Sequence, residues 1–136
     1  MFGCAASGCK VLIKTYDEKY VRVAGSGFDE AYADGDDSSA YDAKWTITFK
    51  GADKVQFKSG FGKYLVAETN GDANANRVDA DTFETFTAED MGNGKYAFLS
   101  EHGKYLVAES DGTLMANRNE ASTQETFEIV IAGKQA

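Results

Sequence analysis

The residue types that could carry out chemistry are sparse in this sequence. His102 is the single histidine, so a nucleophilic triad or a general acid–base step that used histidine would depend on this residue alone. It lies between two predicted strands, where a surface histidine without a catalytic role is typical. Glu68 and Glu109 occupy equivalent places in two copies of an internal repeat, and such places do not meet around a threefold axis, as a glycosidase pair must. The sequence therefore predicts a protein that is not an enzyme and needs no cofactor.

Two other groups of residues resemble metal ligands but lack complete ligand sets. In the acidic run that begins at Asp34, an EF-hand loop would need Gly at its sixth place and Glu at its twelfth, where Ser39 and Trp45 stand. Cys4 and Cys9 have no further Cys or His nearby to complete a zinc site. We expect no metal site, and we interpret the cysteines as free thiols on a flexible N-terminal segment, residues 1–9.

Basic side chains are the best candidates for binding a partner. A lysine-rich group in or beside the first turn of the second and third repeats predicts a basic face, with a solvated edge as the alternative. Asn76-Arg77 and Asn117-Arg118 recur in the same repeats and could donate to a sugar or to a protein carboxylate. A hydrogen bond from the strand end to the neighbouring turn is the alternative for these arginines. The candidate binding residues are Lys58, Lys63, Arg77, His102, Lys104 and Arg118.

Charge and hydropathy exclude several classes of partner. Fourteen Lys and Arg stand against 22 Asp and Glu, which gives a net charge of −8 and opposes binding to nucleic acid or anionic lipid. No apolar run approaches the roughly 20 residues of a membrane-spanning helix. Residues 1–7 lack the features of a signal peptide, and Phe2 stands where myristoylation requires Gly. We expect a cytoplasmic protein without a transmembrane segment.

The elements that position these residues come from an internal repeat. Residues 62–68, with the sequence GKYLVAE, recur unchanged at 103–109, 41 residues later. The same spacing relates ANR at 75–77 to 116–118 and ETF at 84–86 to 125–127. A more divergent copy precedes these two and carries a longer, acidic middle loop, Phe28 to Asp42. The chain is therefore predicted to hold repeats at about residues 10–53, 54–94 and 95–136, which form one domain, residues 10–136.

Each repeat shows the pattern of four short strands separated by turns. In the second repeat, polar and apolar residues alternate over 55–58, a more apolar run follows at 64–67, and Asn70-Gly71 marks a tight hairpin turn. A third strand is predicted near 74–78. A fourth is predicted from Phe83 to Glu89, with Gln124 to Ile131 as its counterpart in the third repeat.

Three units of four strands restrict the architecture. Propellers typically need four to eight blades to close, and the alternating pattern excludes helical repeats. A barrel capped by hairpins, to which every unit contributes strands, leaves few exposed sheet edges. The predicted fold is therefore an all-β β-trefoil.

The GKYLVAE phrase, the following glycine turn and the aromatic residue preceded by Glu resemble the fascin-like and hisactophilin-like β-trefoils. The resemblance covers nearly the whole chain after Cys9. It implies a binding module that attaches to filamentous actin, as cytoskeletal cross-linking and scaffold proteins of this kind do. The chain differs from the multi-trefoil fascins in having a single trefoil, and from hisactophilins in having one histidine.

Two other functions of β-trefoils remain open at this point. A carbohydrate-binding lectin would place a shallow sugar site on each unit, but the ricin-type Gln-x-Trp phrase is absent: the matching triplets end in Trp45, Phe86 and Phe127 and begin with Ala43, Glu84 and Glu125. A protease inhibitor would need an exposed rigid loop, for which the acidic insertion, Phe28 to Asp42, is the candidate. We rank the lectin second and the inhibitor third.

Overall fold

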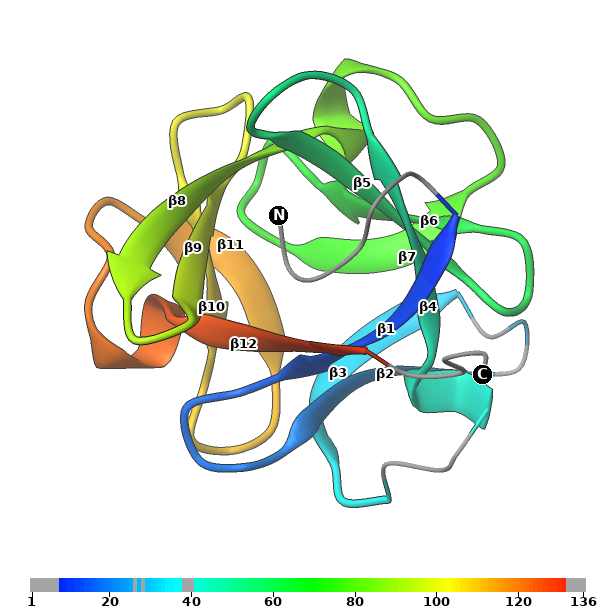
Figure 1. The fold of residues 1–136 in the computed structure, drawn as a ribbon. Helices are drawn as coiled ribbons and strands as arrows, with labels where there is room; N and C mark the ends of the chain where they lie inside the picture. Colours follow the sequence, from blue (N-terminus) through cyan, green and yellow to red (C-terminus); the bar gives the residue numbers. More distant parts are fainter. Residues whose placement is uncertain (1–7, 26, 28, 38–40, 132–136) are drawn as a thin grey trace.

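A computed structural model describes residues 8–25, 27, 29–37 and 41–131. These residues form one sheet of twelve antiparallel strands with three short 3-10 helices, so the all-β class is confirmed. Figure 1 shows the strands as three groups arranged around a common centre.

Every repeat contributes four strands and one 3-10 helix, η, between its third and fourth strands. The first repeat holds β1 (Cys9–Lys14), β2 (Tyr20–Ala24), β3 (Glu30–Gly35), η1 (Tyr41–Ala43) and β4 (Trp45–Phe49). The second holds β5 (Lys54–Ser59), β6 (Tyr64–Ala67), β7 (Ala73–Arg77), η2 (Thr82–Glu84) and β8 (Phe86–Gly92). The third holds β9 (Lys95–Leu99), β10 (Tyr105–Ala108), β11 (Leu114–Arg118), η3 (Thr123–Glu125) and β12 (Phe127–Ile131).

The first and fourth strands of the three repeats close into a ring. Strand β1 pairs with β4, β4 with β5, β5 with β8, β8 with β9, β9 with β12, and β12 with β1. A closed ring has no free edge along which another chain could add a strand. The third repeat therefore completes the barrel that the first begins.

The second and third strands form three hairpins, which contact one another in a second ring. Gly71 and Gly112 adopt positive φ angles of 97° and 94° in two of the hairpin turns, as the Asn-Gly and Asp-Gly signals predict. Each turn accepts a backbone hydrogen bond from the third strand of the following repeat, and the third repeat returns to the first. The bonds are Ala75 N to Asp29 O at 3.0 Å, Ala116 N to Gly71 O at 2.8 Å and Ala33 N to Gly112 O at 2.8 Å.

Large apolar side chains from all three repeats fill the interior. Trp45, Phe86 and Phe127 stand at the start of each fourth strand and are fully buried. Phe57 and Phe98 come from the first strands of the second and third repeats, and their rings meet edge to face at 5.4 Å. The repeated leucines Leu65 and Leu106 lie in the same core. Because a fully buried apolar side chain contributes about 1.5–3 kcal/mol, this shared core couples the repeats.

Two sequence-based expectations are wrong. The predicted fourth strands, Phe83 to Glu89 and Gln124 to Ile131, begin too early, because η2 and η3 occupy their first residues and the strands start at Phe86 and Phe127. Cys9 is disulfide-bonded and is not a free thiol. It begins β1, while Cys4 lies outside the described residues. None of the helices formed by the described residues is long and apolar enough to cross a membrane.

Candidate functional site

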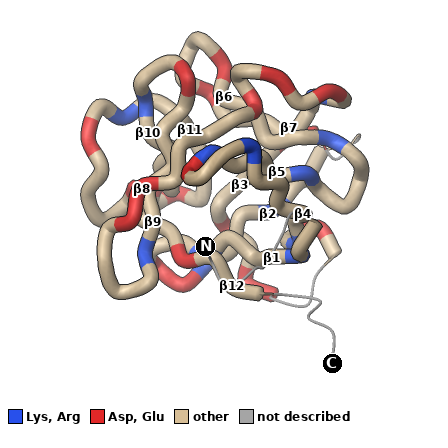
Figure 2. The backbone as a smooth tube through the Cα atoms, turned by 45° about the horizontal axis from the view of Figure 1, so that its top comes forward, with Lys and Arg blue, Asp and Glu red and all other residues tan. Residues whose placement is uncertain are grey.

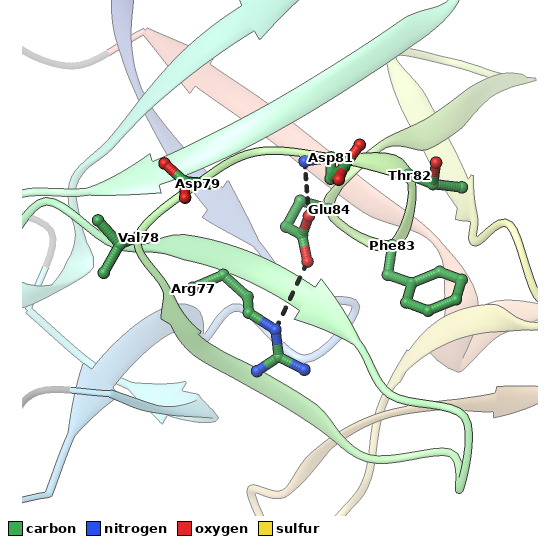
Figure 3. A pocket seen from close by; sticks show the side chains of 7 residues that line it. All are labelled: Arg77, Val78, Asp79, Asp81, Thr82, Phe83 and Glu84. Carbon is green, nitrogen blue, oxygen red and sulfur yellow. Dashed lines mark hydrogen bonds and ion pairs between the residues drawn. The ribbon is translucent and has the colours of Figure 1, made fainter.

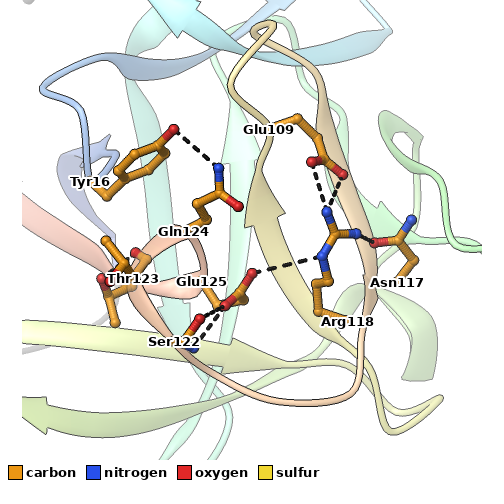
Figure 4. A network of polar contacts seen from close by, with 9 residues as sticks. Tyr16, Glu109, Asn117, Arg118, Ser122, Thr123, Gln124 and Glu125 are labelled. Carbon is orange, nitrogen blue, oxygen red and sulfur yellow. Dashed lines mark hydrogen bonds and ion pairs between the residues drawn. The ribbon is translucent and has the colours of Figure 1, made fainter.

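Arg118, at the end of β11, joins two carboxylates of its own repeat (Figure 4). Its Nη2 donates to both carboxylate oxygens of Glu109, at 2.7 and 2.8 Å. Its Nε lies 3.9 Å from Oε2 of Glu125, which is only 3% exposed. The other oxygen of Glu125 accepts hydrogen bonds from the Ser122 backbone N at 2.7 Å and from Ser122 Oγ at 2.9 Å. The guanidinium thus fastens η3 to the end of the second strand of the repeat.

Arg77 makes the equivalent contacts in the second repeat. Its Nη2 donates to Glu68 at 2.7 Å, and its Nε lies 3.8 Å from Glu84. Glu84 is also 3% exposed and accepts a hydrogen bond from the Asp81 backbone N at 2.6 Å. An external carboxylate or sugar would have to compete with these ion pairs. The geometry therefore favours a structural role for both arginines over the binding role considered from sequence.

In the first repeat, the arginine that bonds to carboxylates of its own repeat comes from another position. Gly35 pairs with the second strand where the other repeats have arginine, and Ala43 stands in place of the buried glutamate. Arg22, from β2, bonds to Asp34 at 2.6 Å and lies 4.0 Å from Asp42. This hydrogen bond raises the pKa of the Arg22 guanidinium. The acidic insertion thus partly neutralises a cation, and the described residues contain no group that could hold a metal ion.

His102 lies at the seam between the second and third repeats. Its Nε2 is 3.0 Å from the carbonyl oxygen of Ala67, and its ring packs on Phe83 with 4.3 Å between ring centroids. At the preceding seam, Phe61 occupies the position of His102 and packs edge to face on Tyr41 at 5.3 Å. A partner at His102 would therefore meet a side chain that already connects two repeats.

The three candidate lysines lie in different local surroundings. Lys58, on β5, places its Nζ 5.6 Å from the centre of the Tyr64 ring. Lys63 lies in the turn from β5 to β6 and is partly exposed. Lys104 lies in the corresponding turn of the third repeat and donates to the Asn119 side chain. Among the described residues, the side-chain contacts of His102 and Lys104 are with Ala67, Phe83 and Asn119, and none of these contacts reaches Lys58 or Lys63.

Two shallow hollows flank η2. One, of about 470 Å³, is lined by Arg77, Val78, Asp79, Asp81, Thr82, Phe83 and Glu84 (Figure 3). Its apolar part comes from Val78 and Phe83, which are 70% and 41% exposed. The other, of about 380 Å³, is polar and is lined by Lys50, Lys54, Gln56, Ala80, Asp81, Thr82, Thr85 and Glu101.

The sequence prediction omitted Lys50 and Lys54. A local charge count could have found them, because residues 44–63 contain five lysines and one aspartate within a chain of net charge −8. The repeat comparison hid part of this signal, since Lys44 and Lys50 have no lysine at the equivalent positions of the other units, whereas Lys54 and Lys63 do.

Comparison with known proteins gives the family. A search of curated proteins found no match to the chain. The family model described as "Fascin domain" matches residues 17–129, which include most of all three repeats. The matched region contains the two arginine networks, the hairpins and most of the barrel strands. The chain therefore belongs to the Fascin domain family.

Proposed function

We propose that the chain is a non-enzymatic β-trefoil binding module that attaches to actin filaments. The trefoil assignment is supported by the closed six-strand ring and by the three hairpins that bond to one another in cyclic order. Binding without catalysis fits the roles of the polar residues: the arginines, their carboxylates and His102 all make contacts that hold the repeats in place.

The observation that carries the actin proposal is membership of the Fascin domain family. Fascin-type domains are associated with actin, whose filaments are acidic. A chain of net charge −8 can approach such a filament only through a local excess of positive charge, because like charges across an interface repel. Lys58 and Lys63, from the second repeat, lie within such an excess.

Co-sedimentation with filamentous actin tests this function. We expect the protein to pellet with filaments at low salt and to be released as the salt concentration rises, because exposed charge pairs are screened. A glycan array run in parallel tests the lectin alternative, since sugar binding through neutral hydrogen bonds responds little to salt. Sugar binding without actin pelleting would replace the proposed function.

The cellular compartment needs a separate test. We propose a cytoplasmic location, which the resemblance to fascin-like proteins supports. The disulfide bond at Cys9 is instead typical of an oxidising compartment, because disulfides rarely persist in the cytosol. Alkylating free thiols in intact cells before purification distinguishes these cases. A modified Cys9 would support the cytoplasmic proposal, and an unmodified Cys9 that becomes reactive only after reduction would contradict it.

A further inference from the structure

The region around the β4–β5 hairpin is positively charged, whereas the chain as a whole is negatively charged. The hairpin and the residues on either side of it, residues 44–63, contain five lysines and a single acidic residue, Asp53; the lysines are Lys44, Lys50, Lys54, Lys58 and Lys63. In the described part of the chain, none of these lysines lies within ion-pair distance of a carboxylate. By contrast, Lys14, Lys95 and all three arginines form ion pairs. The hairpin therefore carries positive charge that the fold does not neutralise by direct pairing.

The strand register places several of these lysines on one face. Trp45, Ile47 and Phe57 point into the core, so the alternating residues of β4 and β5 point outward. Thr46 lies opposite Lys58 on one side and opposite Lys10 of β1 on the other. This arrangement makes a cross-strand row, Lys10–Thr46–Lys58.

A second row lies toward the other end of the hairpin. The Lys50 backbone N donates to the Lys54 carbonyl at 2.8 Å, and Lys54 lies opposite Thr87 of β8. Lys54 and Lys58 are four residues apart on one strand, so the two rows are separated by roughly 13 Å. Figure 2 shows Lys and Arg segments on and around β5, β4 and β1.

Two of the lysine ammonium groups donate hydrogen bonds to uncharged side chains. Lys10 Nζ and Lys54 Nζ each donate to a threonine hydroxyl at 2.6 Å, from Thr46 and Thr87. Each ammonium has three donors, so two remain for a partner. Lys58 lies over the Tyr64 ring, which also keeps its charge. These contacts position the lysines without cancelling their charge.

The equivalent hairpin between the second and third repeats, β8–β9, does not carry such an excess of positive charge. It carries Glu89 and Asp90 on β8, and Lys95 there lies 3.4 Å from Glu128. The basic character thus belongs to one of the repeated hairpins and does not follow from the fold, which all repeats share.

We propose that the two rows, Lys10 and Lys58 and then Lys50 and Lys54, act together with the flanking Lys44 and Lys63 as one docking surface, the lysine face, for a carboxylate-rich segment of a partner protein. This inference rests on the proposed function and specifies which surface of the module meets the filament. Separate ammonium groups on an open sheet suit scattered carboxylates, whereas phosphate recognition favours the paired donors of arginine. Asp81 and Glu101 at the adjoining hollow, and the net charge of −8, oppose a densely charged polyanion such as nucleic acid.

The repeat supplies a matched control for the test. Lys54 and Lys63 of the second repeat correspond to Lys95 and Lys104 of the third. The variants Lys54→Gln/Lys63→Gln and Lys95→Gln/Lys104→Gln therefore remove two charges each from equivalent positions. Thermal melts followed by circular dichroism confirm that both variants fold.

The first measurement uses a fluorescein-labelled poly-L-glutamate peptide of about 20 residues at low salt, followed by anisotropy. We expect the Lys54/Lys63 variant to bind about tenfold more weakly than the unmodified protein, and the Lys95/Lys104 variant to change by less than about twofold. Equal losses in the two variants, or no loss in either, would overturn the proposal. Tighter binding to phosphatidylserine vesicles than to the peptide would also overturn it, in favour of a membrane partner.

The second measurement repeats the comparison by actin co-sedimentation, which separates this inference from the proposed function. Loss of pelleting in the Lys54/Lys63 variant alone supports both. If the unmodified protein does not pellet while peptide binding follows the lysine face, actin is the wrong partner and the docking surface stands. If pelleting survives in the Lys54/Lys63 variant, the filament binds elsewhere and the lysine face is not its docking surface.

Discussion

Two glycines of the third repeat can test whether the hairpins of neighbouring repeats pack against one another. Gly112 and Gly103 both have positive φ angles, of 94° and 79°. A Cβ on Gly112 would lie 2.8 Å from the Cβ of Asp34, in the first repeat, whereas a Cβ on Gly103 would meet nothing within 4 Å. Gly103→Ala therefore measures the conformational cost alone, and Gly112→Ala adds the contact between repeats.

The expected magnitudes follow from these two terms. Placing Ala in the left-handed region costs about 1–2 kcal/mol, and overpacking a tight contact costs about 1–3 kcal/mol. We expect Gly103→Ala to lower the free energy of unfolding by about 1–2 kcal/mol and Gly112→Ala by about 2–5 kcal/mol. The Asp34 Cβ is fixed to the backbone, so it cannot move aside as the end of a flexible side chain could.

Urea denaturation of the purified variants gives the free energies of unfolding, provided that the m-value is unchanged. Gly71→Ala and Gly62→Ala repeat the comparison in the second unit, where a Cβ on Gly71 would lie 2.9 Å from the Asn117 Cβ and one on Gly62 would meet nothing. If both variants of a pair lose the same stability, the hairpins do not pack against the next repeat as described.

Three further predictions concern stability. Leu65→Ala and Leu106→Ala should each cost about 2–5 kcal/mol, because both leucines are buried in the shared core; losses below about 0.5 kcal/mol at both sites in chemical denaturation would refute this. Deleting residues 95–136 should unfold the remainder, since β9 and β12 close the barrel, and a cooperative thermal melt of the fragment would contradict it. Arg118→Ala should cost about 1–2 kcal/mol by leaving the buried Glu125 carboxylate with fewer partners, and an unchanged urea midpoint would argue against the role of the network.

The sequence predicted the strands well where the repeat and the local pattern agreed. The run 64–67 was expected as a strand and is β6, and the turn at Asn70-Gly71 is a tight hairpin turn. The start of the fourth strand was misplaced because apolar alternation was extended through Phe83. A local signal was present: Asp81 and Ser122 are each followed three residues later by a glutamate whose side chain bonds back to their backbone N. This spacing is typical of a helix start.

The candidate binding residues were harder to predict, because their partners come from distant parts of the chain. His102 faces Ala67 and Phe83 across a seam between repeats, which no local pattern reveals. Arg77 and Arg118 recur in the sequence because the network that each completes recurs. Repetition of a polar residue in a symmetric fold therefore indicates a shared structural role as readily as a shared ligand.

This distinction also indicates where function is to be sought in such a chain. Residues that all three repeats share hold the common barrel and hairpins, as Trp45, Phe86 and Phe127 do at the start of the fourth strands. A partner that binds one face of the molecule requires the opposite, namely residues that break the symmetry. Three lysines of residues 44–63 do so: the positions equivalent to Lys44, Lys50 and Lys58 around the β8–β9 hairpin are Thr85, Met91 and Leu99. Lys54 does so in its charge, because its counterpart Lys95 is ion-paired with Glu128. The excess positive charge at this one boundary between repeats is thus a stronger indication of a binding surface than the arginines that recur in two repeats.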